Sequence, residues 1–317
     1  MSSINTNAAA MTALKTLQMT NNSLATTQNR ISTGFRVAEA SDNAAYWSIA
    51  TTMRSDVKSM TTVQDALGLG AAKVDTAYTG MNAAMDLVDE IKSKLVLARE
   101  GGVDRAKVQD EISALQKQLE GIGKTGFSGE NWLTIDSTDG EAVTKSIVSA
   151  FNRASDGSVS VATIDITLFD GTTNDVALFD ENTTAANKVG LLDTQFTIAN
   201  GAATSVDVEY TISTLNISGT DITDAVLDDM ISKTDAALKS MTTAASQLGS
   251  AKKRIDIQST FVSNLMNAID RGVGQLVDAD MNKESTRLQA LQVQQQLGIQ
   301  ALSIANGSAQ SILSLFR

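Results

Sequence analysis

The stretch that decides the fold runs from Tyr46 to Ala98 and reads YWSIATTMRSDVKSMTTVQDALGLGAAKVDTAYTGMNAAMDLVDEIKSKLVLA. Apolar or small residues recur along it in alternating steps of three and four, and only Asp56 and Gly70 break the alternation. The repeating residues are Tyr46, Ile49, Met53, Met60, Val63, Leu67, Val74, Ala77, Met81, Ala84, Val88, Ile91, Leu95 and Ala98. Such spacing over several heptads is typical of helices that pack as a coiled coil, so we predict one helix of roughly 80 Å here.

A second long seam with the same spacing lies near the other end of the chain. Its members are Leu227, Met230, Ala237, Met241, Ala244, Leu248, Ala251, Ile255, Val262, Leu265 and Ile269, with Thr234 and Gln258 as exceptions. The pattern pauses at Arg271–Gly274 and starts again near Asp280. Because the two seams lie in opposite halves of the chain, we expect the N-terminal and C-terminal halves to pack against each other.

Three further helices are predicted beside these seams. The first spans about Asn5 to Ile31, carries leucine or isoleucine every seven residues, and stops near Gly34. The segment Ser41–Asn43 offers N-caps for the long helix, and Gly101 with Gly102 ends it. The third helix has the stripe Val108, Ile112, Leu115, Leu119 and Ile122, and the last has Leu288, Leu291, Leu302, Ala305, Ala309, Ile312 and Phe316.

The centre of the chain, from about Trp132 to Ser218, has a different pattern. Alternating apolar residues predict strands at Val159 and Val161, after a phase shift at Ile164, Ile166 and Leu168, and later at Val206, Val208, Tyr210 and Ile212. Asp156-Gly157 and Asp170-Gly171 favour turns. The segment Asp170–Asp175 lacks the spacing and the terminal Glu of an EF-hand, so we interpret it as an acidic turn.

The composition excludes several classes of protein. The 317 residues include no proline, which favours unusually long helices. They include no cysteine and no histidine, which excludes disulfides, thiol nucleophiles, histidine acid-base chemistry and the commonest zinc ligands. We therefore predict a protein that is not an enzyme and that has no cofactor or metal site.

Charge is distributed unevenly along the chain. The net charge is −11, yet residues 130–230 carry 17 acidic and only 3 basic residues. An acidic, solvated centre with nearly neutral ends indicates that the ends meet other protein surfaces. No stripe of Lys and Arg is available to neutralise phosphates, so nucleic-acid binding is not expected. We also expect neither a cleavable signal peptide nor a membrane span, because no suitable apolar stretch occurs.

These patterns predict an α+β fold in which both chain ends form long coiled-coil-like helices and the centre is an inserted β-rich outer domain. We expect residues 1–42 and 271–317 to form an inner domain, 43–130 and 223–270 a surrounding helical domain, and 131–222 the acidic outer domain. The two outermost helices are thin and rich in Thr, Asn, Gln and Ser. We therefore expect them to order fully only when neighbouring subunits cover them.

Short motifs at both ends point to one family. They are Ser3–Asn7, Arg30–Gly34, Arg36-Val37, Ala40–Ala45 and Ile49-Ala50 at the start, and Leu248–Ala251, Arg254-Ile255, Val277–Asp280 and Ser311–Arg317 at the end. In these motifs and their order the chain closely resembles bacterial flagellin, over roughly the first 130 and last 95 residues. Two independent end motifs in the correct order make the resemblance specific.

The resemblance implies a structural subunit that polymerises into the extracellular flagellar filament for motility. It implies that the terminal helices form an inner tube, that the long helices form a shell, and that the centre projects outward. Implied partners are further copies of the chain, sister flagellins, an export chaperone, the filament cap and hook-associated proteins, after unfolded type III export without a cleaved signal. The alternatives on the same ends are a hook-filament junction protein and a secreted adhesin-like binding protein.

Pattern and resemblance together nominate assembly residues. On the inner helices these are Ile4, Leu17, Leu24, Ile31, Leu288, Leu291, Leu302, Ile312 and Phe316. Polar candidates for contacts between subunits are Arg30, Arg36, Asp42 and Arg254, with a solvated surface as the alternative. Gln289, Gln292, Gln294, Gln295 and Gln296 either line a polar lumen or keep an exposed helix face soluble.

Two departures from the family pattern concern host receptors. The usual Asp-Asp-Ala-Ala-Gly run is replaced by Asp42–Tyr46, followed by Trp47. An Arg-Val-Arg-Glu-Leu-like stretch is replaced by Glu90–Lys94. We therefore predict that plant and animal innate receptors respond weakly to this chain.

Overall fold

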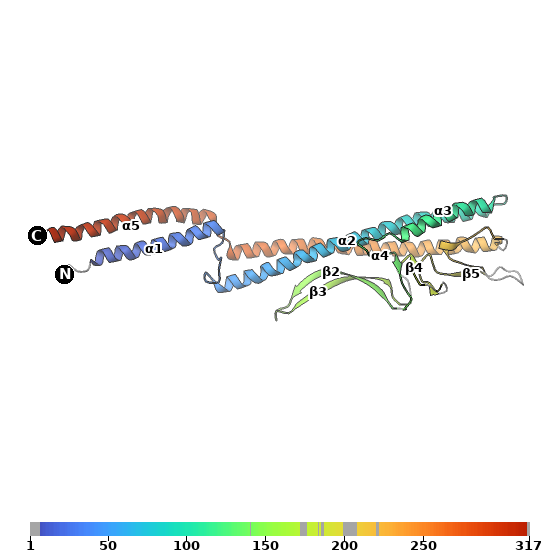
Figure 1. The fold of residues 1–317 in the computed structure, drawn as a ribbon, viewed down its shortest axis with the longest axis horizontal. Helices are drawn as coiled ribbons and strands as arrows, with labels where there is room; N and C mark the ends of the chain where they lie inside the picture. Colours follow the sequence, from blue (N-terminus) through green and yellow to red (C-terminus); the bar gives the residue numbers. More distant parts are fainter. Residues whose placement is uncertain are drawn as a thin grey trace. The chain divides into compact units, whose positions relative to one another are not determined.

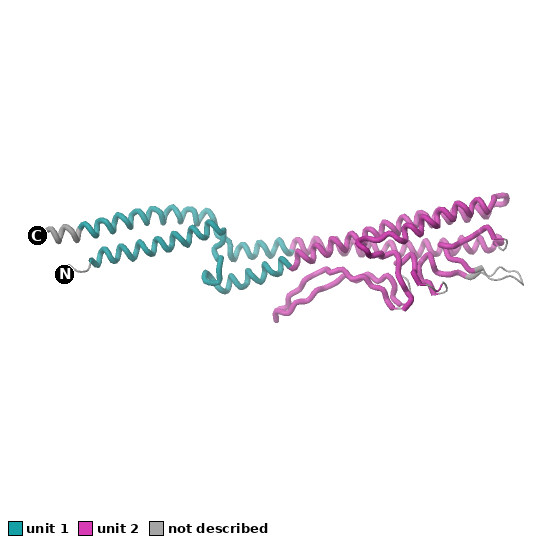
Figure 2. The backbone as a smooth tube through the Cα atoms, viewed as in Figure 1, with its two compact units in different colours: residues 1–58, 265–317 teal, residues 59–264 magenta. Residues whose placement is uncertain are grey.

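A computed structural model describes residues 7–139, 141–171, 176–182, 184, 187–198, 208–219 and 222–315, with backbone only at 197, 198, 208 and 308–315. In chain order the elements are α1 (Ala8–Thr33), α2 (Ala44–Ala98), α3 (Arg105–Gly123), β1 (Thr134–Ile135), β2 (Val143–Arg153), β3 (Val159–Phe169), β4 (Phe179–Asp180), β5 (Phe196–Ile198), β6 (Val208–Tyr210), η2 (Ile212–Thr214), α4 (Asp224–Val277) and α5 (Met281–Leu315) (Figure 1). The chain divides into unit 1, residues 1–58 and 265–317, and unit 2, residues 59–264 (Figure 2). The α+β fold with helical ends is confirmed.

Unit 1 contains an antiparallel pair formed by α1 and α5, which lie side by side in Figure 1. Asn7 Oδ1 accepts a hydrogen bond from the backbone N–H of Ala10 and so caps α1, and Gly34 ends the helix with φ 76°. That left-handed conformation suits glycine, as the sequence predicted. The loop after α1 is held by a small core in which Val37 and Ala50 contact Val273 and Val277.

This core explains two corrections within unit 1. The pause predicted at Arg271–Gly274 is wrong, because α4 continues unbroken to Val277. Val273 and Val277 keep the helix packed in spite of the two glycines. The seam of α2 also begins later than predicted: Ile49 is exposed and its neighbour Ala50 is buried instead.

Unit 2 is organised around the antiparallel parts of α2 and α4. Their predicted seams are buried, with Leu67, Met81 and Leu95 from α2 and Met241 and Leu248 from α4 almost fully covered. Ion pairs Lys252–Asp75 at 2.6 Å and Lys92–Asp235 at 2.6 Å fix the register along the outside of the pair. Thr234, an exception in the seam, is buried because its hydroxyl donates to the Met230 carbonyl at 2.8 Å.

The third helix of unit 2 begins and ends as the sequence indicated. Gly102 has φ 95° between α2 and α3, and Asp104 caps α3 by accepting from the Ala106 N–H. Val108, Ile112 and Leu119 form its buried stripe. Gln109 and Gln116 on its flank hydrogen bond to the backbone of Leu215, which ties the end of the outer region to α3.

Strands β2 and β3 form a long antiparallel hairpin that the sequence predicted only in part. Strand β3 is confirmed, whereas β2 was not predicted. The phase shift between Val161 and Ile164 reflects the two faces of β3, because Val159 and Val161 are exposed whereas Ile164 and Ile166 are buried. A β-bulge lies on the opposite strand, where the register slips between Val148 and Ala150. Ile147 packs against Gly70, where an added Cβ would lie 2.5 Å from its side chain. Gly70, which interrupts the α2 seam, therefore leaves the space in which Ile147 of the hairpin packs against α2.

The remaining strands are short. β1 pairs with β4 in parallel, and β5 pairs with β6 antiparallel. The strand predicted from Val206 to Ile212 is shorter than expected, because Ile212 begins the 3-10 helix η2 and Val206 lies outside the described residues. Among the described residues, no helix combines the length and the apolar character that crossing a membrane requires.

A buried carboxylate organises the strands of the outer region. Asp180 accepts hydrogen bonds from the Ser137 N–H and hydroxyl and from the N–H groups of Asn182 and Val189. Burial acts to raise the pKa of Asp180, but these hydrogen bonds outweigh it and lower the pKa below its ordinary value. Asp193, also buried, accepts from Ser213 and Lys188 nearby. Polar bonds as well as apolar packing thus hold these strands together.

Candidate assembly interface

The six predicted leucine and isoleucine positions that the structure describes in full lie between α1 and α5 of one chain. Leu17, Leu24, Ile31, Leu288 and Leu302 are half-buried, and Leu291 is buried. Gly298 faces Leu17, where an added Cβ would come within 3.2 Å of Leu17 Cδ1. These residues form an intramolecular seam, and the prediction that they also contact other subunits stays a prediction. Ile4 and Phe316 lie outside the described residues, as does the side chain of Ile312.

Polar contacts set the register of this pair. The Gln295 amide donates to Asn21 Oδ1 at 2.8 Å, and the Asn7 amide donates to the Ala305 carbonyl at 2.9 Å. Arg30 forms an ion pair of 3.3 Å with Glu284, whose side chain is almost fully covered. The seam between α1 and α5 therefore combines half-buried apolar side chains with polar bonds, whereas the α2 and α4 seams of unit 2 are almost fully covered.

A second apolar stripe runs along α5 on the side away from α1. Val293, Leu297 and Ile304 are 55%, 57% and 73% exposed, respectively. With 3.6 residues per turn, these three positions lie nearly opposite Leu291, Gly298 and Leu302, which face α1. α5 is thus apolar on two opposite sides, and its own chain covers only one of them.

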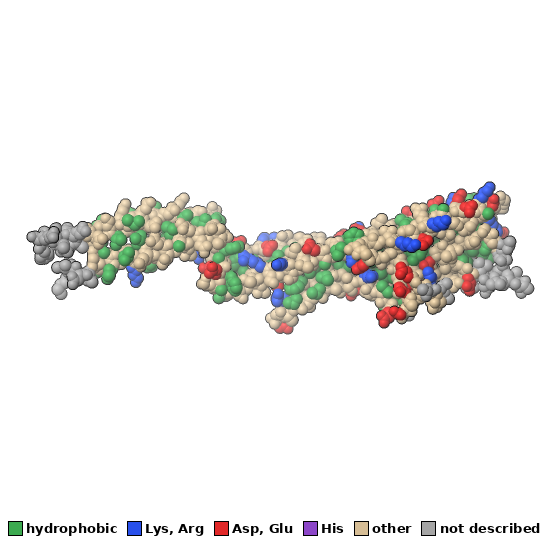
Figure 3. All heavy atoms as spheres, viewed as in Figure 1, with side chains coloured by type: hydrophobic (Ala, Val, Ile, Leu, Met, Phe, Trp, Pro, Cys, Tyr) green, Lys and Arg blue, Asp and Glu red, His purple; other side chains and the backbone are tan. Residues whose placement is uncertain are grey.

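The exposed side of α1 also carries large apolar residues, with Lys15 between them. Met11 and Met19 are 62% and 63% exposed, and Leu14 is 46% exposed. Lys15 is the one charged residue between Ala8 and Asn29, and α5 has none from Leu288 to Leu315. Figure 3 shows the difference on one face, where charged side chains gather over unit 2 and are sparse along α1 and α5. Little charge therefore opposes burial of either helix.

The sequence did not nominate these exposed residues, although it held the information. The prediction followed one apolar repeat on each terminal helix, and that repeat is the intramolecular seam. A second repeat, through Val293, Leu297 and Ile304, was not recognised in the sequence. Of the nominated glutamines, Gln295 lies in the seam, and the other four are exposed.

Three of the four polar candidates have partners within their own chain. Arg30 pairs with Glu284, and the Arg36 guanidinium donates to the Leu276 carbonyl at 2.7 Å. Asp42 Oδ2 accepts from the N–H groups of Ala38 and Glu39, which shapes the loop before α2. These contacts supply an in-chain role for each residue, and contact with another subunit stays a prediction.

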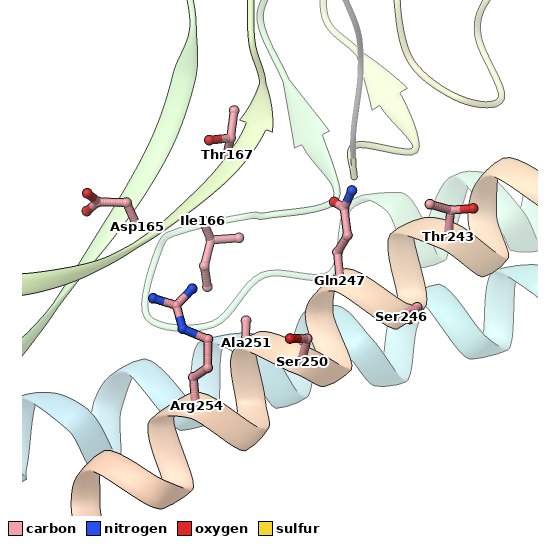
Figure 4. Close-up of a pocket in the computed structure, with 9 residues that line it drawn as sticks. All are labelled: Asp165, Ile166, Thr167, Thr243, Ser246, Gln247, Ser250, Ala251 and Arg254. Atoms are coloured by element: carbon pink, nitrogen blue, oxygen red, sulfur yellow. The ribbon is translucent and has the colours of Figure 1, made fainter.

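Arg254, the fourth candidate, lies in unit 2 at an open groove of about 460 Å³ between β3 and α4. Figure 4 shows Asp165 and Thr167 on the strand side, with Ser250 and Arg254 on the helix side. Within the part of the chain that the structure describes, Arg254 forms no ion pair. Polar side chains line most of the groove, together with Ile166 and Ala251, which suits a hydrated surface or a contact between subunits.

The stretch Glu90–Lys94 is engaged in ion pairs on unit 2. Lys92 lies 2.6 Å from Asp235, and Lys94 lies 2.5 Å from Glu111 of α3. Hydrogen bonds from Lys239 and Lys92 lower the pKa of Asp235 to about 2. The lysines are therefore tied to acidic neighbours rather than projecting freely from the helix.

Two terminal helices that each leave an apolar side uncovered define a class of protein: a subunit that is completed by association with other chains. Comparison with known proteins agrees with this class. The chain matches the bacterial flagellin N-terminal helical region over residues 4–138 and the bacterial flagellin C-terminal helical region over residues 231–316. The chain belongs to the bacterial flagellin family.

Relatives match over their whole length. Flagellin C of Rhizobium meliloti strain 1021 is 48% identical to this chain over 327 residues. Flagellin A of Rhizobium meliloti is 44% identical over 399 residues, and a flagellin of Brucella melitensis biotype 1 is 44% identical over 319 residues. Each of these alignments covers 100% of both chains. An alignment of 399 positions exceeds this chain of 317 residues, so that relative carries additional residues. As a flagellin, the chain is a structural subunit of the extracellular flagellar filament, polymerises with copies of itself, and is not an enzyme.

Proposed function

We propose that the chain polymerises by burying the uncovered sides of α1 and α5 against the same helices of neighbouring subunits. The observation that carries this proposal is the second apolar stripe of α5, formed by Val293, Leu297 and Ile304. Apolar surface removed from water contributes about 25 cal/mol per Å². Because the stripe repeats in every subunit, this gain repeats along the whole filament.

The two sides of α5 then have different roles. The side with Leu288, Leu291 and Leu302 joins α5 to α1 within a subunit, and the opposite side joins subunits. Gln289, Gln292 and Gln296 lie on a flank between these two sides, since they fall within about one quarter-turn of one another. This flank is the part of α5 that we assign to the polar lumen.

The experiment compares two sets of substitutions that replace exposed apolar residues by glutamine. In the test variant, Val293→Gln, Leu297→Gln and Ile304→Gln remove the free stripe but keep good helix formers. In the control variant, Val96→Gln and Leu97→Gln change apolar residues that are 54% and 47% exposed at the end of α2. Purified subunits are mixed with sheared filament seeds, and growth is measured by sedimentation and electron microscopy.

We expect the test variant to stay monomeric and the control variant to elongate the seeds. Circular dichroism checks that both retain their helices. Normal elongation by the test variant would contradict the proposal, because polymerisation would then not need this side of α5. No feature of the described residues favours the junction-protein or adhesin alternatives.

The same exposed stripe supports a proposal about partners. Before assembly, a helix with exposed Val, Leu and Ile side chains and no charge from Leu288 to Leu315 would associate nonspecifically, so we assign α5 to an export chaperone that covers it. The filament cap and the hook-associated proteins would meet the same surface at the two ends of the polymer. Loss of chaperone binding by the triple glutamine variant, measured by calorimetry, tests the first assignment.

A further inference from the structure

The methionines that the structure describes differ widely in exposure. Met11 and Met19, on α1, are 62% and 63% exposed. Met81, Met230 and Met241, in the core of unit 2, are fully covered. The chain has no cysteine, so thioethers are its only sulfur groups. Met281, on α5, is 43% exposed, so we expect an oxidant in solution to reach the two sulfurs of α1 first and that of Met281 next.

We propose that Met11 and Met19 are oxidation sites, and that their conversion to methionine sulfoxide blocks assembly of the subunit. The co-reactant is a peroxide. Its O–O bond breaks, one oxygen atom forms a bond to the thioether sulfur, and the other leaves as water after taking up the second proton. The sulfur loses two electrons and the peroxide gains them, so the step is balanced.

The consequence for assembly follows from where the two side chains lie. With 3.6 residues per turn, Met11 and Met19 lie on the side of α1 away from Leu17 and Leu24, which face α5. Oxidation there leaves the intramolecular seam intact. It replaces a flexible apolar group by a strong hydrogen-bond acceptor on the side that the proposed function buries. The inference rests on that proposed function.

The oxidised subunit should remain folded but assemble poorly. An acceptor that is buried without a donor loses its bonds to water, and the one charged side chain near Met11 and Met19 is that of Lys15, four residues from each. We expect the concentration required for elongation to rise about tenfold or more. Unit 2 should be unaffected, because its core methionines are protected.

The first experiment locates the oxidation. Monomers and filaments are treated with hydrogen peroxide, and sulfoxides are mapped by mass spectrometry of peptides. In monomers, Met11 and Met19 are expected to oxidise before Met81, Met230 and Met241, and both should oxidise more slowly in filaments. Equal rates at Met11 in monomers and filaments would overturn the inference, since that side of α1 would then stay open in the polymer.

The second experiment tests the effect on assembly with matched variants. The double variant Met11→Leu with Met19→Leu keeps apolar bulk and helix propensity but has no sulfur at these positions. Met281→Leu removes another exposed methionine, 43% exposed, and serves as control. After peroxide treatment, the double variant should elongate seeds normally, whereas the Met281→Leu variant should be inhibited as strongly as the parent chain.

The outcomes separate the two proposals. Inhibition of the double variant equal to that of the parent would overturn the inference, as would protection by Met281→Leu. Normal elongation by oxidised parent subunits would also overturn it while leaving the proposed function intact. Failure of the untreated double variant to elongate seeds would show that a thioether is required in the contact between subunits. Untreated parent subunits that never elongate seeds would contradict the proposed function instead.

Discussion

The paired helices of unit 1 and those of unit 2 share one sequence pattern but differ in how completely they are buried. In unit 2, leucine and methionine side chains such as Leu67 and Met241 are fully covered by their own chain. In the seam of unit 1, the leucines other than Leu291 are half-buried, and the seam includes Thr27, Gln295 and Gly298. Steps of three and four therefore specify a helix pair in both places. Only in unit 2 do they specify a self-sufficient core.

The difference shows which part of the sequence carries the information for assembly, namely the terminal helices. A helix in a two-helix pair needs one apolar stripe, and α5 has two. Weak intramolecular packing combined with an uncovered apolar side leaves the terminal helices dependent on neighbours. A fully buried core makes unit 2 independent of them.

Deleting Leu297–Arg317 should abolish filament formation altogether while leaving unit 2 folded. The deletion removes two of the three residues of the free stripe and also Leu302 from the seam. Filaments are scored by electron microscopy, and unit 2 is followed through the fluorescence of Trp132, which is buried there. Filaments of normal length from the truncated chain would contradict the contrast between the units.

Single leucine truncations should have unequal effects on stability. Leu248→Ala, in the core of unit 2, should lower the free energy of unfolding by about 2–5 kcal/mol because it leaves a cavity. Leu24→Ala, in the half-buried seam of α1, should change the Trp132 transition by less than about 0.5 kcal/mol. Urea unfolding in a Trp47→Phe background isolates the Trp132 signal. Equal changes in the free energy of unfolding would show that the seam of α1 stabilises unit 2 as much as the core of unit 2 does.

Asp180→Asn should weaken the outer region of unit 2 by about 1–3 kcal/mol at neutral pH, because a buried acceptor of several hydrogen bonds is altered. The pH dependence has a definite sign. Since the folded-state pKa of Asp180 is below 3.8, its contribution is present above that pH and is lost as the pH falls through the lowered value. Acid titrations of parent and variant should therefore converge, and a constant difference down to about pH 2 would exclude this role.

The smallest effect is expected at the surface ion pairs of unit 2. Lys239→Gln removes one of two lysines that contact Asp235. Exposed pairs contribute little because solvent screens them, so the melting temperature should fall by about 2 °C or less. Calorimetry of parent and variant measures the shift. A fall comparable to that of Leu248→Ala would mean that charge, rather than packing, holds α2 to α4.

Much of the fold was predictable because helix spacing and turn chemistry are local properties. Gly34, Asn43 and Gly102 end or cap helices where the sequence indicated, since each position depends on backbone geometry within a few residues. The continuation of α4 through Gly272 and Gly274 was not predictable in this way. It depends on Val273 and Val277 packing against Val37, which lies far away in the sequence.

The hairpin and the assembly surface show the same limit. Strand β2 has weak alternation because a bulge near Ser149 shifts its phase, and its position depends on Ile147 fitting over Gly70. The assembly residues nominated from the sequence were those with the clearest repeat, and that repeat serves the pair within one chain. The surface left for other chains became visible only once α1 was placed against one side of α5.

The most direct test of the central claim is a cryo-electron microscopy reconstruction of filaments built from this chain. The account predicts that the side of α5 carrying Val293, Leu297 and Ile304 is covered by helices of neighbouring subunits, with the side carrying Leu291 against α1 of the same chain. A filament in which that stripe faces open solvent, or a shaft from which the chain is absent, would contradict it.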